Sequence, residues 1–81
     1  MIEAYVLIHV EPGTTPAVLA AVSRVSGVAS ADGLAGPYDV IARLKARNLD
    51  ELATIVTTEI QAAGGVMRTL VCVVPGSEDG S

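Results

Sequence analysis

Four consecutive residues, Gly36-Pro37-Tyr38-Asp39, hold polar groups that could contact a small molecule. Glycine carries no Cβ, so its backbone amide can come close to a ligand carboxylate. Asp39 could receive an ammonium group or pair with Arg43, because a carboxylate on an apolar strand face needs a partner or water. The same residues also suit a turn, since glycine tolerates positive φ and proline fixes its own φ, and Tyr38 could belong to the core. The segment therefore predicts either a ligand-binding loop or a structural turn.

Four side chains elsewhere offer weaker chemistry. Arg68 and Thr69 open the last apolar segment, where each could contact a ligand, lie on a strand edge or cap the preceding turn. His9 has no partner at metal-ligand spacing, which favours a structural histidine over a metal ligand or a general base. Cys72 stands alone in the apolar run TLVCVV, which favours a small buried hydrophobic residue. We therefore expect no disulfide, no metal site and no cofactor.

The sequence offers little for catalysis. It has no Ser-His-Asp arrangement, no glycine-rich phosphate loop and no pair of carboxylates placed for acid–base chemistry. A small cofactor-free isomerase or monooxygenase would have only His9, Tyr38 and Asp39 to recruit. We therefore predict no catalytic residues and no enzyme activity, with that small enzyme as the alternative.

Length and composition indicate one small domain that gains from association. A monomer of this size hides only about 60% of the surface of its unfolded chain. Yet 51% of the residues are apolar, which favours an oligomer that covers the excess. The net charge of −4 argues against direct nucleic-acid binding, which needs clustered Lys and Arg. The N-terminus lacks a basic segment and is too short to span a membrane, so we expect a cytoplasmic protein without membrane contact.

The steps between apolar residues predict the element order βαββαβ. Strands are expected at residues 3–10, 28–35, 38–45 and 66–74. The first helix should begin with Thr15 as its cap and run to about residue 25. The second should begin at Asn48, which forms a capping-box pattern with Glu51, and end at the glycine pair 64–65. Its apolar stripe is expected to comprise Leu49, Leu52, Ala53, Val56 and Ile60.

Right-handed crossovers would fold these elements into one antiparallel four-stranded sheet with both helices on one face, the ferredoxin-like α+β layout. The other face would be apolar and exposed in a monomer, so a partner sheet should cover it. Its expected residues are drawn from Tyr5, Leu7, Ile41, Val71 and Val73. We assign residues 1–75 to the domain and residues 76–81, GSEDGS, to a disordered C-terminal tail.

Three segments resemble the effector-binding domain of the Lrp/AsnC transcriptional regulators, also called the domain for regulation of amino-acid metabolism. They are AYVLIHVEPGTTPAVLAAV, GPYDVIARLKARNLDELATIV and GGVMRTLVCVV, and the resemblance runs from residue 4 to residue 74. The most specific piece is G-x-Y-D at Gly36, Tyr38 and Asp39. It is supported by the strand-ending Pro12-Gly13 and by the G-V-x-R-T pattern that opens the last strand.

The resemblance implies a dimeric α/β-barrel-type assembly in which two sheets pack face to face and dimers associate further. It also implies that free amino acids or related small molecules bind in a cleft between dimers, beside the G-x-Y-D turn. Gly36, Tyr38 and Asp39 are therefore the implied ligand-binding residues, with Thr69 as a weaker candidate. The common regulator has an N-terminal helix-turn-helix, whereas the first strand here begins at residue 3, so the chain resembles the stand-alone form of the domain.

Two functions follow from this resemblance. The chain could be an oligomeric sensor of an amino acid or related metabolite that modulates transcription or metabolism through its assembly. Alternatively, it could be an interaction module that binds no metabolite and co-assembles with a full-length Lrp/AsnC regulator. The partners expected are therefore a second copy, a small metabolite and, in the alternative, a full-length relative.

Overall fold

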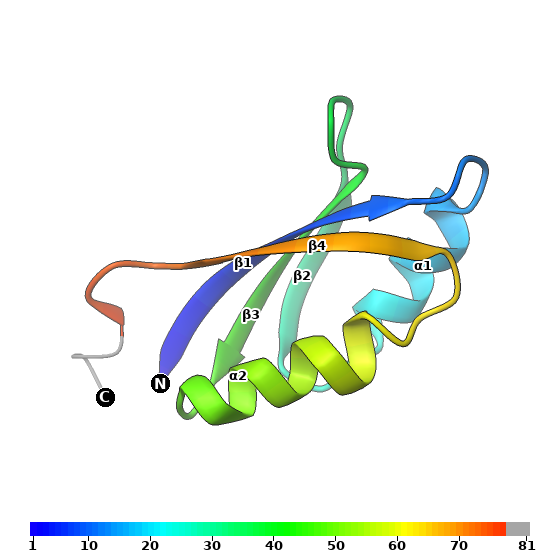
Figure 1. Cartoon of the computed structure of the whole chain (residues 1–81). Coiled ribbons are helices and arrows are strands. Elements are labelled where there is room, and N and C mark those ends of the chain that lie inside the picture. The colour runs from blue at the N-terminus through cyan, green and yellow to red at the C-terminus, as the bar shows by residue number, and fades with distance from the viewer. Residues whose placement is uncertain (78–81) are drawn as a thin grey trace.

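The computed structural model describes residues 1–77, in which four antiparallel strands form one sheet and the helices cover one of its faces (Figure 1). The strands are β1 (Ile2–Val10), β2 (Val28–Gly33), β3 (Val40–Ala46) and β4 (Val66–Val73), in the spatial order β2-β3-β1-β4. Helix α1 (Thr15–Ser23) joins β1 to β2, and α2 (Leu49–Ile55) joins β3 to β4 through a π-helical segment, η1 (Val56–Ile60). The ferredoxin-like βαββαβ prediction is confirmed.

The core lies between the sheet and the helices because alternate residues of a strand point to the same face. Every second residue of β1 and β3 is buried there, as are inward residues of the helices. The buried strand residues are Ile2, Ala4, Val6, Ile8 and Val10 of β1 and Val40, Ala42, Leu44 and Ala46 of β3. The buried helix residues are Val18, Val22, Leu52, Val56 and Ile60.

Helix α1 differs in detail from its prediction. Thr14, not Thr15, occupies the cap position, and its Oγ1 donates to the Glu11 carbonyl at 2.6 Å instead of capping a helical N–H. The helix ends at Ser23, two residues earlier than expected. The Arg24 N–H there already donates to the Ala21 carbonyl, three residues back, and Gly27 follows with a φ of +97°.

The start of α2 is confirmed at Asn48, whose Oδ1 accepts from the Glu51 N–H at 2.8 Å. The reciprocal bond of a capping box goes one residue further back, from the Arg47 N–H to Glu51 Oε1 at 2.9 Å. The expected apolar stripe is partly wrong, because Leu49 is 60% exposed and Ala53 is also exposed. Only the residues spaced by four, Leu52, Val56 and Ile60, are buried.

The π-helical segment explains how that spacing stays on one face. In an α-helix each four-residue step turns the side chain by about 40° beyond a full turn. Residues 56–60 form a wider turn, in which the Gln61 N–H donates to the Val56 carbonyl five residues back at 2.8 Å. Ile60 therefore still faces the sheet and is fully buried.

The register of β4 divides the apolar residues expected on the open face of the sheet, which is the face without helices. Val71 pairs with Val6 and Val73 with Ala4, so both lie on the helix side. Leu70, the cross-strand partner of Leu7, lies on the open face instead.

Cys72 also lies on the open face, because it pairs with Tyr5. It is exposed, so the prediction of a buried cysteine is wrong. The reason is that β4 is an edge strand whose open face no other part of residues 1–77 covers.

The hairpin between β2 and β3 is longer than the short turn predicted. β2 ends at Gly33 and β3 begins at Val40, which leaves a loop of residues 34–39. The Leu34 N–H closes this loop by donating to the Asp39 carbonyl at 2.8 Å.

At the C-terminal end, the Glu3 N–H donates to Ser77 Oγ at 3.1 Å, which ties residue 77 to β1. The rest of the predicted tail, residues 78–81, lies outside the described residues. Among residues 1–77 no helix is both long and apolar enough to cross a membrane.

Candidate functional site

The loop of residues 34–39 extends past the end of the sheet as a projecting hairpin (Figure 1). Gly36 has a φ of +154°, a conformation that residues with a side chain rarely adopt. No atom lies within 4 Å of the place where a Cβ would stand, so the glycine is required by its backbone and not by crowding. The Gly36 amide is thus carried on an exposed loop that a ligand can approach.

Tyr38 and Asp39 follow at the base of the hairpin, and both are half-buried. The Tyr38 hydroxyl makes no hydrogen bond within the part of the chain that the structure describes, so it is available to a ligand or to a second subunit. Tyr38 follows Gly36 by two residues, at the foot of the projecting loop. These two residues can together offer a backbone N–H and a phenolic donor.

Asp39 is held by three hydrogen bonds, two to β1 and one to the start of its own loop. Its N–H donates to the Ile8 carbonyl at 2.9 Å, and its carbonyl accepts from the Leu34 N–H at 2.8 Å. Its Oδ2 accepts from the Val10 N–H at 2.9 Å. The expected alternative pairing with Arg43 is not seen, since the Arg43 guanidinium lies 3.6 Å from Glu3 Oε1.

His9 lies beside this carboxylate, with Nδ1 at 3.1 Å from Asp39 Oδ2. This pair of atoms does not have the geometry of a hydrogen bond, and the Nδ1 atom is shielded from solvent. On its other side His9 pairs with Arg68 across β1 and β4. Asp39, His9 and Arg68 therefore form a row across the open face at the end nearest the hairpin.

Thr69 is not part of this row. It pairs with the buried Ile8, so it lies on the helix side of the sheet. Its Oγ1 accepts from Gln61 Nε2 at 3.0 Å. Gly36, Tyr38 and Asp39 thus lie in one loop, whereas Thr69 lies on the opposite face of the sheet from the Asp39 carboxylate.

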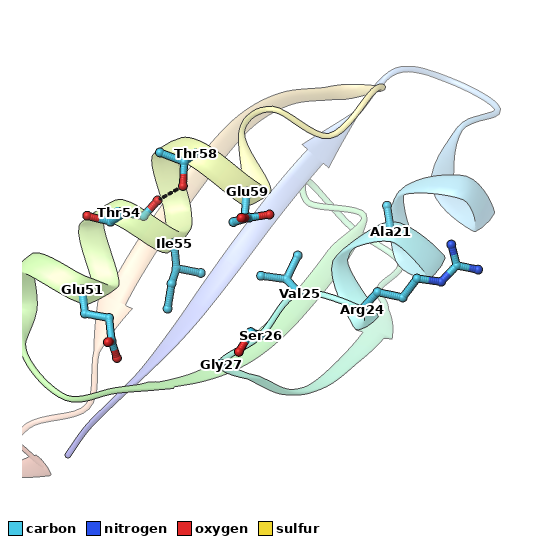
Figure 2. A pocket seen from close by; sticks show the side chains of 10 residues that line it. All are labelled: Ala21, Arg24, Val25, Ser26, Gly27, Glu51, Thr54, Ile55, Thr58 and Glu59. Atoms are coloured by element: carbon cyan, nitrogen blue, oxygen red, sulfur yellow. Dashed lines mark hydrogen bonds between the residues drawn. The ribbon is translucent and has the colours of Figure 1, made fainter.

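A groove of about 410 Å³ lies elsewhere, between the end of α1 and the side of α2 and η1 that faces it (Figure 2). Both threonine hydroxyls in its lining are engaged: Thr58 Oγ1 donates to the Thr54 carbonyl at 2.6 Å, and Thr54 Oγ1 donates to the Asp50 carbonyl at 2.9 Å. Figure 2 shows the Arg24 side chain extending away from α2. The groove holds none of the predicted site residues, so the hairpin is the better candidate.

Glu51, at the end of the groove, has a structural role. The Arg47 backbone N–H, and after it the Arg47 guanidinium, whose Nε lies 2.8 Å from Oε2, lower the pKa of the Glu51 carboxyl below its usual value of 4.5. Both bonds join the residues just before α2 to its first turn. The perturbed group therefore stabilises a helix start and gives no sign of a catalytic acid.

Residues 3–76 match the family model of the Lrp/AsnC ligand binding domain. The chain belongs to this family. Its members' shared domain accounts for nearly the whole chain, and the G-x-Y-D hairpin lies inside the matched range. A search of curated protein sequences gave no match.

Solved structures agree with this Lrp/AsnC assignment. A protein from Thermus thermophilus superposes with a TM-score of 0.87 at 32% identity, over 91% of this chain and 92% of that one. Escherichia coli AsnC superposes with a TM-score of 0.86 at 20% identity, over 91% of this chain and 50% of AsnC. A transcriptional regulator from Neisseria meningitidis, solved as a complex with L-Met, gives 0.80 at 16% identity, over 90% of this chain and 49% of that one. This chain thus spans about half the length of the last two, which share its fold.

The sequence did not reveal how His9 and Val10 take part in this Lrp/AsnC hairpin. Both contact a carboxylate about thirty positions along the chain, because β1 and β3 are neighbours in the sheet. The only sequence signal was the order of strands, which brings residues 9 and 39 to the same end of adjacent strands. The alternation of side chains along β1 and β3 then places both on the open face.

Proposed function

We propose that this Lrp/AsnC ligand-binding domain senses a free amino acid or a closely related metabolite at a contact between subunits of a cytoplasmic homo-oligomer. The observation that carries the proposal is the projecting hairpin, where Gly36 combines positive φ with open space at the position that a Cβ would occupy. The Tyr38 hydroxyl, which has no hydrogen-bond partner among residues 1–77, supplies a second polar group, and Asp39 holds the base of the same loop. The L-Met complex of the Neisseria regulator supports an amino acid as the ligand class.

The open face of the sheet supports the oligomer. Tyr5 is 40% and Leu70 is 45% exposed there, and Cys72 is exposed beside them. Burial of apolar surface contributes roughly 25 cal/mol per Å², so a second sheet laid on this face would be stabilising. At the far end of the same face, Glu3 Oε1 lies 3.6 Å from the Arg43 guanidinium and 3.8 Å from Lys45 Nζ. These three charged side chains are therefore already paired with one another.

Ligand and assembly would be linked through differential affinity. A metabolite that contacts two subunits binds the assembled state better than the separated one, and it shifts the equilibrium by that difference. The Lrp/AsnC assignment describes a ligand-binding domain and gives no catalytic group. We therefore propose no reaction for His9, Tyr38 or Asp39, and a change in assembly as the output.

Thermal unfolding against the twenty amino acids and related metabolites tests the proposal. A compound at a hundred times its dissociation constant adds about 2.7 kcal/mol per site, which raises Tm by several degrees in so small a domain. Tyr38→Phe should reduce the shift given by the active compound, because only the free hydroxyl is removed. Ser26→Ala is the control: it removes an exposed hydroxyl from the segment between α1 and β2, away from the hairpin, and should keep the shift.

A wild-type protein that no compound stabilises would contradict the sensor and favour the alternative. The exposed apolar face could then accept the sheet of a full-length relative, making the chain an interaction module. Co-expression with a regulator of the same family that carries a helix-turn-helix, followed by co-purification, separates the two functions. A sensor should purify as a self-oligomer, whereas an interaction module should purify as a mixed complex.

A further inference from the structure

We propose that Asp39 is a positioning residue that fixes the base of the β2–β3 hairpin to the end of β1 and thereby connects the hairpin to the open face. This inference rests on the ligand site proposed above. It gives Asp39 a role other than receiving the ammonium group of an amino acid. The carboxylate acts through the shape and attachment of the loop that carries Gly36 and Tyr38.

The end of the β1–β3 ladder shows why a side chain is needed. The paired residues run from Ile2 and Ala46 to Ile8 and Val40. Beyond that point the chain turns into the hairpin, and the Val10 N–H, the next donor of β1 on this side, is accepted by Asp39 Oδ2 at 2.9 Å. A carboxylate oxygen thus takes the place of a backbone acceptor just where the ladder stops.

Asp39 also closes the loop from the other side. Its carbonyl accepts from the Leu34 N–H at 2.8 Å, and its N–H donates to the Ile8 carbonyl at 2.9 Å. One residue therefore ties both ends of the loop to β1. Loss of the carboxylate would leave the Val10 N–H without its acceptor and remove one of these ties.

The bond between Asp39 and the Val10 N–H also connects the hairpin to the open face. The register between β1 and β4 shifts between His9 and Val10, so the Val10 N–H that Asp39 binds belongs to a bulge. His9 Nδ1 lies 3.1 Å from the same carboxylate oxygen, and His9 pairs with Arg68 of β4. A ligand that moves the hairpin would thus displace the bulge and the row of polar side chains at the rim of the open face. This is a direct route from ligand to subunit contact.

Amide hydrogen exchange of the full chain, followed by NMR, tests the attachment without any ligand. In Asp39→Ala the Val10 amide should exchange at least about fivefold faster, because its acceptor is gone. Asp39→Asn keeps an acceptor oxygen and should recover most of the protection. Asp32→Ala is the matched control, since Asp32 is an exposed aspartate on β2. Unchanged protection of Val10 in Asp39→Ala would overturn the proposal.

A binding experiment then distinguishes a positioning role of Asp39 from direct contact between Asp39 and the ligand. An equimolar mixture of the twenty amino acids serves as the probe in thermal unfolding. Asp39→Ala should lose the stabilisation given to the wild type, and Asp39→Asn should recover most of it. An Asp39→Asn protein that protects Val10 but gains no stabilisation would mean that the carboxylate charge contacts the amino acid, and the positioning role in binding would be wrong. A wild type without any stabilisation would contradict the proposed function alone, and the exchange of Val10 would still decide the attachment.

Discussion

The backbone at Gly36 has a φ of +154°, and no atom lies within 4 Å of the position that a Cβ would occupy. Gly36→Ala should therefore destabilise through backbone strain alone, by about 1–2 kcal/mol. Gly64→Ala is the control: Gly64 also has open space around it but no positive φ, so the change should stay within about 0.5 kcal/mol. Urea unfolding of both variants measures the difference. Equal losses would mean that the hairpin does not depend on the conformation of Gly36.

Sequence reasoning could find Gly36, Tyr38 and Asp39 because they are adjacent and of unusual type. It could not find the partners of Asp39, because the Val10 N–H belongs to the backbone and leaves no mark on the sequence. For the same reason, the role of His9 as a neighbour of Asp39 depends on which strands lie side by side. The sequence could thus propose the site as a segment but could not predict the contacts that Asp39 makes.

The two leucines at the start of α2 offer a test of how the helix packs. Leu52 is 4% exposed and Leu49 is 60% exposed, although the sequence placed both on one apolar stripe. Leu52→Ala should lower the free energy of unfolding by about 2–5 kcal/mol, because it leaves a cavity under the helix. Leu49→Ala should cost less than about 1 kcal/mol. Chemical denaturation of the two variants checks this, and similar losses would contradict the observed orientation of α2.

The attachment of Arg47 to Glu51 makes the start of α2 sensitive to acid. The folded-state pKa of Glu51 is lowered, chiefly by the Arg47 backbone N–H and then by its side chain. A group with a lowered folded pKa contributes stability above its unfolded pKa and loses it as pH falls through the folded value. Wild-type stability should therefore exceed that of Glu51→Gln at neutral pH, and the gap should shrink as pH falls below the usual value of 4.5 and through the lowered folded pKa. Urea midpoints at several pH values measure the gap, and a constant gap would show that the charge of Glu51 is not involved.

Element order was predictable because each segment carries its own period, two for strands and three to four for helices. The residues at which the elements begin and end were less predictable. The hairpin loop is longer than predicted because β2 ends at Gly33 and β3 begins only at Val40, while Leu34 and Asp39 bond to each other across the base of the loop. The π-helical segment could not be read from the sequence either. The wider turn keeps the Ile60 side chain facing the sheet, whereas a regular α-helix would rotate that side chain away from the sheet.

At the scale of the whole molecule, the sheet has two unlike faces. One is buried under the helices, and the other carries Tyr5, Leu7, Ile41 and Leu70 without cover within residues 1–77. Sequence patterning predicted both faces, since β1 is apolar on each side. It could not assign β4, because a shift of one residue moves every side chain to the opposite face. The register placed Leu70 on the open face and Val71 on the other.

The open face therefore gives the prediction on which the proposed assembly depends. Leu70 is 45% exposed on this face, and Leu49 is 60% exposed on the helix side, so the two leucines are matched in type and accessibility. A lysine in a sheet-to-sheet contact must bury its charge or break the contact. Leu70→Lys should convert the oligomer to a folded monomer, and Leu49→Lys should leave at least the dimer intact. Light scattering coupled to size exclusion gives the mass, and circular dichroism confirms the fold. A Leu70→Lys protein with the mass of the wild type would move the subunit contact away from this face, and a monomeric wild type would contradict assembly altogether.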